Sequence, residues 1–586
     1  MIALELLESR GASTLAALDS PSRLRELSVD ELIALAAEIR GFLVTSVAAT
    51  GGHLGSNLGI VELTIALHRA VTSPTDAVIW DTGHQAYVHK LLTGRHDRFG
   101  SLRKSGGLSG YPSRGESEHD LVENSHASTA LSYAYGLASA RRVRSDHGHV
   151  VAVVGDGSIT GGVAYEALNN IGTFGARVVI VLNDNGRSYA PTVSPLTSPT
   201  GGAAAGFFGS LGIAYHGPID GHDLAALDDA LDTVLAHEGP VVLHVRTVKG
   251  RGYAPAELDE DKCLHDVAPF NPSTGIALSA GVPRLSYTEA FGAAMLREAH
   301  AHPELVAITA AMGGPTGLGA FRERYPERFF DVGIAEQHAV NAAAGMAMGG
   351  LRPVVAIYST FLSRAWDQLY YDVGLHRLPV IFCLDRAGIT GDDGPSHHGV
   401  LDLMLLAKVP GMTVLAPSSY EELGGMLHEA LGITDGPVAL RWPKSDARSQ
   451  PMVGSGLRAR RISSGTDVCI LGVGKLVAAC EVAAAVLIAS GLDATVWDAR
   501  AVAPLDPTML DDAARHPLVV TVEDGVVDGG FGSRVRSCLE SRGSPAPRVV
   551  TCGVPTAYLP HGSAADLLSG LGLDGGGIAR TVLRHC

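Results

Sequence analysis

Two short strings of this chain hold residue types that could bind a metal ion: Gly155-Asp156-Gly157 and Asn183-Asp184-Asn185. Asp156 supplies a carboxylate and Asn185 an amide, and both carry the hard oxygen atoms that Mg²⁺ prefers. Either string alone is also typical of an ordinary turn or strand end. Because the strings occur together, each after a run rich in Val and Ile, the pair favours a metal site over two unrelated turns.

The surrounding sequence predicts the elements that would bring these two side chains together. The apolar runs 150–154 and 178–182 indicate buried strands, and the segment from Gly162 to about Asn170 has room for a crossover helix. Two parallel strands joined in this way end at the same edge of a sheet, where open α/β sheets bind ligands. The order strand, Gly-Asp-Gly, helix, strand, Asn-Asp-Asn resembles the metal and diphosphate motif of thiamine diphosphate (ThDP) enzymes.

Glu336 is a further candidate, within the string Phe330-Asp331-Val332-Gly333-Ile334-Ala335-Glu336-Gln337-His338. ThDP chemistry needs a carboxylate against the aminopyrimidine ring. The apolar neighbours of Glu336 favour a buried side chain, whose raised pKa would let it share a proton with a ring nitrogen. The simpler alternative is a Glu that forms a salt bridge at the start of a helix.

Histidines and basic residues supply candidates for proton transfer and anion binding. Most of the 24 histidines are expected on the surface or in the core, but those beside glycines in turns can approach a ligand closely. A lone Arg is usually a salt-bridge partner, whereas several basic residues at strand ends could form a phosphate pocket. The candidates are His53, His84, His126, His265, His397 and His398, with Arg364, Arg386, Arg441 and Lys444.

Composition narrows the class of protein. A chain of 586 residues with 46% hydrophobic and 18% charged residues is expected to form several globular domains. The net charge of −16 argues against nucleic acid and anionic membranes as partners. The seven Cys include no Cys-x-x-Cys pair, and Met1-Ile2-Ala3-Leu4-Glu5 lacks the basic region of a signal peptide, so a cytoplasmic protein is expected.

The alternation of helical and strand patterns predicts an α/β protein with three mainly parallel sheets flanked by helices. We expect domains at 1–270, 285–448 and 460–586, with linkers near 268–285 and 445–460. Ser28, followed by acidic residues, predicts a helix that ends near Gly41. The first half of the segment 192–216, rich in Pro, Ser, Gly and Ala, predicts a flexible loop.

Motifs along most of the chain, from about residue 40 to 575, resemble the 1-deoxy-D-xylulose-5-phosphate synthase family of transketolase-like ThDP enzymes. The resemblance rests on GHLGSNLG, ENSHASTALSYA, GPIDGHD, FDVGIAEQHAV and SHHG, among other strings. ESEHD and YSTFL, also present here, are absent from plain transketolases. The order of the three expected domains fits the same family.

The resemblance implies roles for individual residues. Asp156, Asn185 and the backbone carbonyl of Arg187 would bind Mg²⁺. Glu336 would activate the aminopyrimidine, with Phe361 packed on that ring. Residues implied to contact ThDP are His84, Ser125, His126, Ala127, Gly157, Ser158, Asn185 and Tyr253. Those implied in proton transfer are His53, His84, His265 and His397. Those implied at the acceptor phosphate are Tyr358, Arg386, Asp393, His397 and Lys444, with Arg364 on the pyruvate side.

The resemblance also implies a reaction. Pyruvate would lose CO₂, and its remaining two-carbon unit would join D-glyceraldehyde 3-phosphate to give 1-deoxy-D-xylulose 5-phosphate, a precursor of isoprenoids, thiamine and pyridoxal. The family resemblance implies a homodimer.

Two departures from the family keep alternatives open. The segment 192–216 is shorter than the family's usual segment after the Asn-Asp-Asn motif, and Trp442-Pro443-Lys444 stands where an Arg usually follows Tyr-Pro. Since Lys lacks the bidentate fork of Arg, the acceptor could differ. A specialised paralogue that joins pyruvate to another aldehyde is therefore an alternative. A non-catalytic homologue is disfavoured, because the candidate catalytic residues are all present.

Overall fold

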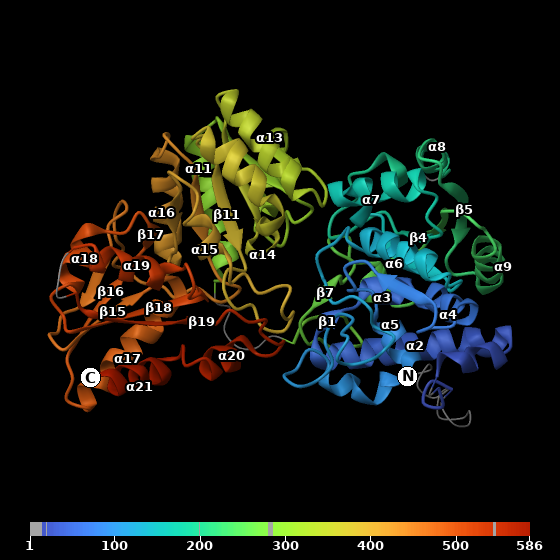
Figure 1. Cartoon of the computed structure of the whole chain (residues 1–586), viewed down its shortest axis with the longest axis horizontal. Coiled ribbons are helices and arrows are strands. Elements are labelled where there is room, and N and C mark those ends of the chain that lie inside the picture. Colours follow the sequence, from blue (N-terminus) through green and yellow to red (C-terminus); the bar gives the residue numbers. More distant parts are fainter. Residues whose placement is uncertain (1–13, 19, 198–199, 279–284, 543–545) are drawn as a thin grey trace. The chain divides into compact units, whose positions relative to one another are not determined.

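The computed structural model describes residues 14–18, 20–197, 200–278, 285–542 and 546–586. The N-terminal string 1–5, residues 198–199 of the expected loop and residues 279–284 of the expected linker lie outside the described residues. The chain forms two compact units, Met1–Ala280 and Gly281–Cys586 (Figure 1).

Unit 1 is built on a five-stranded sheet in the order β2-β3-β4-β6-β5, in which every neighbouring pair is parallel. A short antiparallel pair, β1 with β7, lies outside this sheet. The strands are β1 (Gly52–His53), β2 (Ala77–Trp80), β3 (Val150–Gly155), β4 (Val179–Asp184), β5 (Ala214–Asp220), β6 (Val241–Arg246) and β7 (Asp266–Val267).

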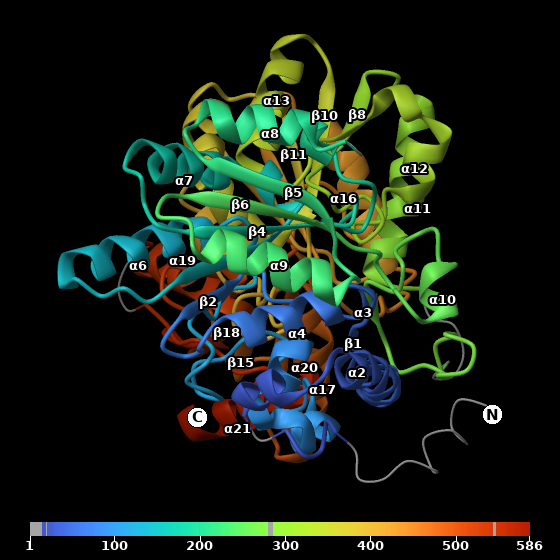
Figure 2. The same cartoon turned by 90° about the vertical axis from the view of Figure 1, so that its right-hand side faces the viewer.

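Helices cover both faces of this sheet, with α7 and α8 on one face and α4 and α9 on the other (Figure 2). The helices of unit 1 are α2 (Val29–Thr50), α3 (Gly55–Gly59), α4 (Val61–Ala70), α5 (Tyr87–Lys90), α6 (Ala130–Arg144), α7 (Gly162–Thr173), α8 (Gly202–Ser210), α9 (Leu224–Leu235) and α10 (Ala254–Glu257). The predicted crossover helix from Gly162 is α7, so this expectation is confirmed.

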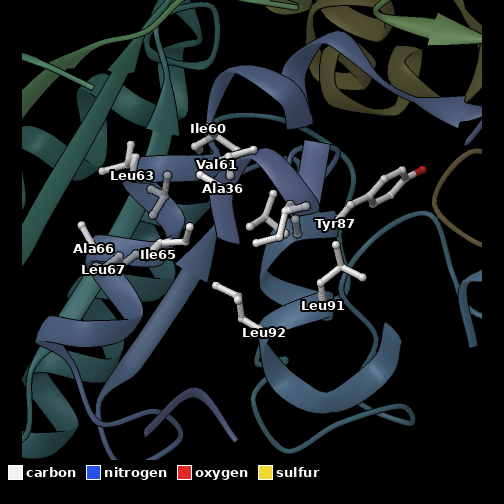
Figure 3. Close-up of a cluster of buried hydrophobic side chains, with 14 of the residues drawn as sticks. Ala36, Ile60, Val61, Leu63, Ile65, Ala66, Leu67, Tyr87, Leu91 and Leu92 are labelled. Carbon is white, nitrogen blue, oxygen red and sulfur yellow. The ribbon is translucent and has the colours of Figure 1, made fainter. Parts of the chain in front are cut away.

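Alternate residues of each central strand enter different cores, because successive side chains point to opposite faces. Val151 and Val153 of β3 pack into the core that includes α2, α4 and α9, whereas Ala152 and Val154 pack against α6, α7 and α8. Figure 3 shows part of the first core, including Leu67 of α4. The sheet is therefore buried on both faces, as its apolar strands predict.

Helix α2 begins at the predicted place but runs past Gly41 to Thr50. Ser28 and Glu31 form a reciprocal capping box at its start. A Gly inside a helix costs only about 1 kcal/mol, and the buried Leu43 and Val47 continue the apolar face beyond it. Among the described residues α2 is the one helix long and apolar enough to span a membrane, yet its apolar face belongs to the core of unit 1.

Unit 2 contains two sheets. The larger has the order β17-β12-β13-β11-β10-β8-β9 and is parallel except at β17. Its strands are β8 (Leu305–Thr309), β9 (Phe329–Asp331), β10 (Arg352–Tyr358), β11 (Ile381–Asp385), β12 (Thr413–Leu415), β13 (Val438–Arg441) and β17 (Ala501–Ala503). The helices of this part are α11 (Tyr287–Ala301), α12 (Gly319–Arg324), α13 (Glu336–Met348), α14 (Ser359–Leu362), α15 (Asp402–Leu406) and α16 (Tyr420–Gly432).

The smaller sheet has the order β14-β16-β15-β18-β19, with only the β14 pair antiparallel. Its strands are β14 (Arg460–Ser463), β15 (Val468–Gly472), β16 (Ala494–Asp498), β18 (Leu518–Val526) and β19 (Arg548–Val554). The associated helices are α17 (Val477–Ala489), α18 (Pro507–Ala513), α19 (Phe531–Glu540), α20 (Ala564–Gly570) and α21 (Gly575–His585). The predicted α/β class with mainly parallel sheets is confirmed.

The predicted loop covers the first half of the segment 192–216, where the described residues before Gly202 are irregular apart from the short 3-10 helix Pro195–Thr197. Residues Gly202–Ser210 form α8, and β5 begins at Ala214. Phe208 anchors α8 in the core beside the sheet. The sequence pattern did not predict this helix, because its Gly residues disfavour a helix although its Ala residues favour one.

Candidate active site

Asp156 and Asn185 lie at one edge of the sheet of unit 1. Strands β3 and β4 are parallel neighbours, and their register pairs Gly155 with Asn183. Asp156 follows β3 directly and Asn185 follows β4 directly. The predicted arrangement of the two strings at neighbouring strand ends is therefore confirmed.

The donor set at this edge suits Mg²⁺. Asp156 is 2% exposed, accepts a hydrogen bond from the Thr192 hydroxyl, and has a pKa that burial raises to about 6. Asn185 Oδ1 accepts a bond from the Arg187 amide at 3.2 Å. Among the described residues, no group of three His, Cys, Asp or Glu side chains forms a metal site. The predicted Mg²⁺ ligands would not form such a group, because only Asp156 among them is one of these four residue types. Their carboxylate, amide and carbonyl oxygens fit a hard cation.

Asp81 connects the segment of Ser125, His126 and Ala127 to this edge. Its carboxylate, at the end of β2, accepts bonds from the amides of Ser128 (2.8 Å) and Ala130 (3.0 Å). The Ser128 hydroxyl in turn donates to the carbonyl of Ser158 at 2.6 Å. The predicted ThDP contacts at 125–127 and at Gly157–Ser158 are thus held beside each other.

Three of the predicted histidines form a cluster in unit 1. The ring centroids of His53, His84 and His265 lie 5.1–5.8 Å apart. Burial lowers the pKa of both His84 and His265 well below the ordinary value, so both are neutral imidazoles near pH 7. The buried His84 Nδ1 has no hydrogen-bond partner in the structure. Neutral rings of this kind can accept a proton from a ligand.

Lys249 and Asn57 belong to this cluster but were not among the predicted site residues. Lys249 Nζ lies 2.6 Å from His265 Nδ1, and burial lowers its pKa to about 7. Asn57 Nδ2 donates to the carbonyls of His53 (2.9 Å) and His84 (2.8 Å), which ties the two turns together. Asn57 lies inside the GHLGSNLG motif, so the sequence carried a signal for it, whereas the role of Lys249 depends on its contact with His265 in the folded chain. Tyr253, which the family resemblance implies at ThDP, uses its hydroxyl to donate a hydrogen bond to the carbonyl of Pro272.

Glu336 is the first residue of α13 in unit 2 and is 4% exposed. Its Oε2 atom is buried without a hydrogen-bond partner. Burial raises the pKa of Glu336, although Arg364 acts in the opposite direction. The position of Glu336 at a helix start agrees with the alternative of a Glu that forms a salt bridge there. A buried carboxyl oxygen without a partner is unusual, however, and it could accept a hydrogen bond from the ring of a bound ligand.

Aromatic and basic side chains gather where β10 and β11 end. Tyr358 and Phe361 stack with centroids 5.6 Å apart, and His397 lies 5.7 Å from Phe361. The Arg386 guanidinium lies over the Tyr358 ring at 4.5 Å. The parallel register of Tyr358 with Asp385 explains why these residues meet.

Arg441 and Lys444 differ in their surroundings. Arg441 is 2% exposed and bonds to Asp402 (2.9 Å) and Asp524 (2.6 Å), so it is a structural residue rather than a phosphate ligand. This corrects its candidacy for the phosphate pocket. Lys444 Nζ lies 3.4 Å from a carboxylate oxygen of both Asp392 and Asp393.

Comparison with family models identifies the class of this protein as the transketolase-like enzymes. The family model described as 1-deoxy-D-xylulose-5-phosphate synthase matches residues 15–200 and 198–247. The transketolase pyrimidine-binding and C-terminal domain models match residues 284–450 and 457–578. A protein of Mycobacteroides abscessus described as 1-deoxy-D-xylulose-5-phosphate synthase is 49% identical to this chain, and the alignment covers 96% of this chain and 95% of that protein.

A synthase of the same description from Rhodococcus jostii is also 49% identical, over 97% of this chain and 95% of its own. The transketolase of Campylobacter jejuni is 16% identical, with a TM-score of 0.46 and 95% of this chain and 100% of that chain covered. The chain belongs to the 1-deoxy-D-xylulose-5-phosphate synthase family. It is a transketolase-type transferase that depends on ThDP and a divalent metal.

The relatives also bear on the segment 192–216. The first family model matches in two segments that meet at residues 198–200. The alignment with the M. abscessus protein spans 613 positions, more than the 586 residues of this chain. This chain therefore lacks residues that its relative has, and the divided match supports their absence from this segment.

Proposed function

We propose that this chain decarboxylates pyruvate and joins the remaining two-carbon unit to D-glyceraldehyde 3-phosphate, with Glu336 as the carboxylate that contacts the ThDP aminopyrimidine. The observation that carries this assignment is the buried Glu336 Oε2 without a hydrogen-bond partner. A carboxyl group with a raised pKa can share a proton with a ring nitrogen. Bound ThDP supplies the electron sink for loss of CO₂.

The edge of the sheet in unit 1 would hold the charged end of the cofactor. Asp156, Asn185 and the carbonyl of Arg187 would hold Mg²⁺, and residues 125–127, Gly157 and Ser158 would contact the cofactor. The buried histidines His53, His84 and His265 would exchange protons with substrate oxygens. This role is supported by the close packing of the three rings and by the neutral state of His84 and His265.

The group at the ends of β10 and β11 would bind the substrates. Arg386, Tyr358 and His397 would contact the acceptor, and Lys444 and Asp393 would lie at its phosphate end. Arg364 would face the pyruvate carboxylate, while Phe361 would pack on the aminopyrimidine. The stacking of Tyr358, Phe361 and Arg386 supports a single preorganised site.

A second candidate function is a carboligase for another aldehyde. Lys444, which stands where the family usually has Arg, is paired with two carboxylates. Those carboxylates offset its charge, and a Lys makes no bidentate contact with phosphate. A less highly charged acceptor would suit this arrangement.

A competition among aldehydes separates the two functions. The purified protein, loaded with Mg²⁺ and ThDP, is given ¹³C-labelled pyruvate with equal amounts of D-glyceraldehyde 3-phosphate, D-erythrose 4-phosphate and unphosphorylated D-glyceraldehyde. We expect 1-deoxy-D-xylulose 5-phosphate as the main product by NMR. A different main product would support the second function. If none of the mixtures released CO₂, both functions would be contradicted.

We also infer the organisation of the molecule. The domain boundaries 1–270, 285–448 and 460–586 are supported by the limits of the matched family models. The proposed homodimer is supported by the family resemblance and by exposed apolar side chains on α13 and the neighbouring segment Gln368–Leu375: Met348, Tyr371 and Leu375. A cytoplasmic location is supported by the family resemblance.

A further inference from the structure

A network of charged side chains lies buried in unit 1 and does not include Asp156 or Asn185, the residues at the proposed metal edge of the sheet. Arg95 donates to both carboxylate oxygens of Asp120 (2.6 and 2.9 Å) and lies 3.4 Å from Glu116 Oε2, which also pairs with Lys90. His89 Nε2 lies 2.9 Å from Asp120 Oδ1. The side chains of these five residues are at most 8% exposed.

Asp120 is ionised in this network. Burial raises its pKa, but His89 and Arg95 outweigh that effect and lower the pKa below the ordinary value. Breaking a buried ion pair by removing one partner is strongly destabilising, because it leaves an uncompensated charge. The network is therefore a rigid anchor for any backbone that its carboxylates bind.

Both carboxylates bind the backbone of one short segment. Glu116 Oε1 accepts a hydrogen bond from the Ser109 amide at 2.6 Å, and Asp120 Oδ2 accepts one from the Ser113 amide at 2.7 Å. The two amides flank Tyr111 and Pro112. Bonds from amides to ionised carboxylates are about twice as strong as neutral ones, so the segment is held on both sides of Tyr111.

The held segment covers two of the histidine turns. The ring centroid of Tyr111 lies 5.4 Å from that of His53 in an edge-on contact. Pro112 packs so closely on Gly83, the neighbour of His84, that a Cβ atom at Gly83 would overlap it. The ESEHD string, which supplies Glu116 and Asp120, thus acts on the histidine cluster through the segment 109–113.

We propose that Glu116 and Asp120 are positioning residues for catalysis: anchored by Lys90 and Arg95, they hold Tyr111 against His53 and so fix the orientation of that imidazole. This inference rests on the proposed role of His53 in proton transfer. A displacement of about 1 Å in a reacting group can cost 100-fold in rate, so a loosened Tyr111 should lower turnover without changing the metal edge.

The test compares Glu116→Gln, Tyr111→Leu and Tyr111→Phe with the unaltered holoenzyme. We expect Glu116→Gln and Tyr111→Leu to lower kcat with pyruvate and D-glyceraldehyde 3-phosphate by about tenfold or more, in line with a misplaced catalytic group. The Kd for ThDP in the presence of Mg²⁺ should stay within about twofold. Tyr111→Phe, which keeps the ring, should retain kcat within about threefold. Amide exchange at Ser109 should accelerate in Glu116→Gln.

Asp76→Asn is the matched control. Asp76 is also a buried carboxylate, and it accepts bonds from the amides of Thr72 and His149, both at 2.7 Å, at the opposite end of β2 from His84. We expect this variant to lose thermal stability while keeping kcat. The inference would be overturned if Tyr111→Leu had the same kcat as the wild type, or if Asp76→Asn lost as much kcat as Glu116→Gln and Tyr111→Leu. An inactive wild-type protein would instead contradict the proposed function.

Discussion

Two basic residues near the end of β13 illustrate how burial separates structural from functional charges. Arg441 is enclosed with Asp402 and Asp524, and its guanidinium satisfies two carboxylates. The side chain of Lys444, three residues later, is 39% exposed and pairs with Asp392 and Asp393 at 3.4 Å. An exposed pair of this kind contributes little stability, so Lys444 can exchange its partners for a ligand phosphate.

Substitution of Lys444 tests that role. Lys444→Met should raise the KM for D-glyceraldehyde 3-phosphate by about tenfold, because one charge-assisted contact to phosphate is lost. Lys444→Arg should lower this KM, since a guanidinium can bind phosphate through two bonds. The kcat at saturating substrate should change little in either variant. Steady-state kinetics at fixed, saturating pyruvate measure both constants, and an unchanged KM in Lys444→Met would remove Lys444 from the phosphate site.

Among the elements, α2, α4 and the turn after β5 are joined by a buried ion network. Glu62 of α4 accepts two bonds from Arg40 of α2, at 2.6 and 2.7 Å, and its Oε2 lies 3.1 Å from His222 Nδ1. Burial alone would raise the pKa of Glu62, but His222 and Arg40 lower it to about 2. Because the folded pKa lies below the ordinary value, ionised Glu62 stabilises the fold above about pH 4.5, and that contribution is lost as the pH falls toward 2.

Glu62→Gln should therefore lower the thermal midpoint at pH 7, where the ion pairs are fully formed. The difference between wild type and variant should shrink as the pH falls below about 4.5, since protonated Glu62 then resembles the amide. Thermal unfolding followed by circular dichroism at several pH values measures this difference. A constant difference from pH 7 to pH 3 would contradict the role given to Glu62.

Local patterns predicted the elements that position Asp156 and Asn185, because a Val- and Ile-rich run between turn residues has few alternatives to a buried strand. They did not predict that α2 continues past Gly41, since packing of Val47 in the core outweighs a local Gly preference. The roles of Lys249 and Asp81 were also beyond local patterns. Their importance lies in contacts with His265 and Ser128, which depend on the tertiary fold.

At the scale of the whole molecule, the second and third expected domains share a core within unit 2. Ile357 of the larger sheet and Leu471 of the smaller sheet belong to one buried cluster, and β17 joins the larger sheet although it follows β15 and β16 of the smaller one. This shared core explains why residues 281–586 form one compact unit. The sequence showed two α/β patterns there but not their common core.

The proposed homodimer gives a prediction for the intact protein. Light scattering coupled to size exclusion should yield twice the chain mass of 60.8 kDa. Burial of the exposed Tyr371 and Leu375 would supply part of the association free energy, at about 25 cal/mol per Å² of apolar surface. A mass of one chain at micromolar concentration, in the presence of Mg²⁺ and ThDP, would contradict the dimer.

Turnover and cofactor binding in Glu336 variants test the central assignment most directly. The purified wild type, Glu336→Gln and Glu336→Ala are compared for CO₂ release from pyruvate with D-glyceraldehyde 3-phosphate present, and for ThDP binding in the presence of Mg²⁺ by calorimetry. We expect both variants to lose turnover while ThDP still binds, because the residues of unit 1 proposed to bind the metal and the diphosphate are unchanged. Wild-type turnover in either variant would show that Glu336 is not the carboxylate that this reaction requires.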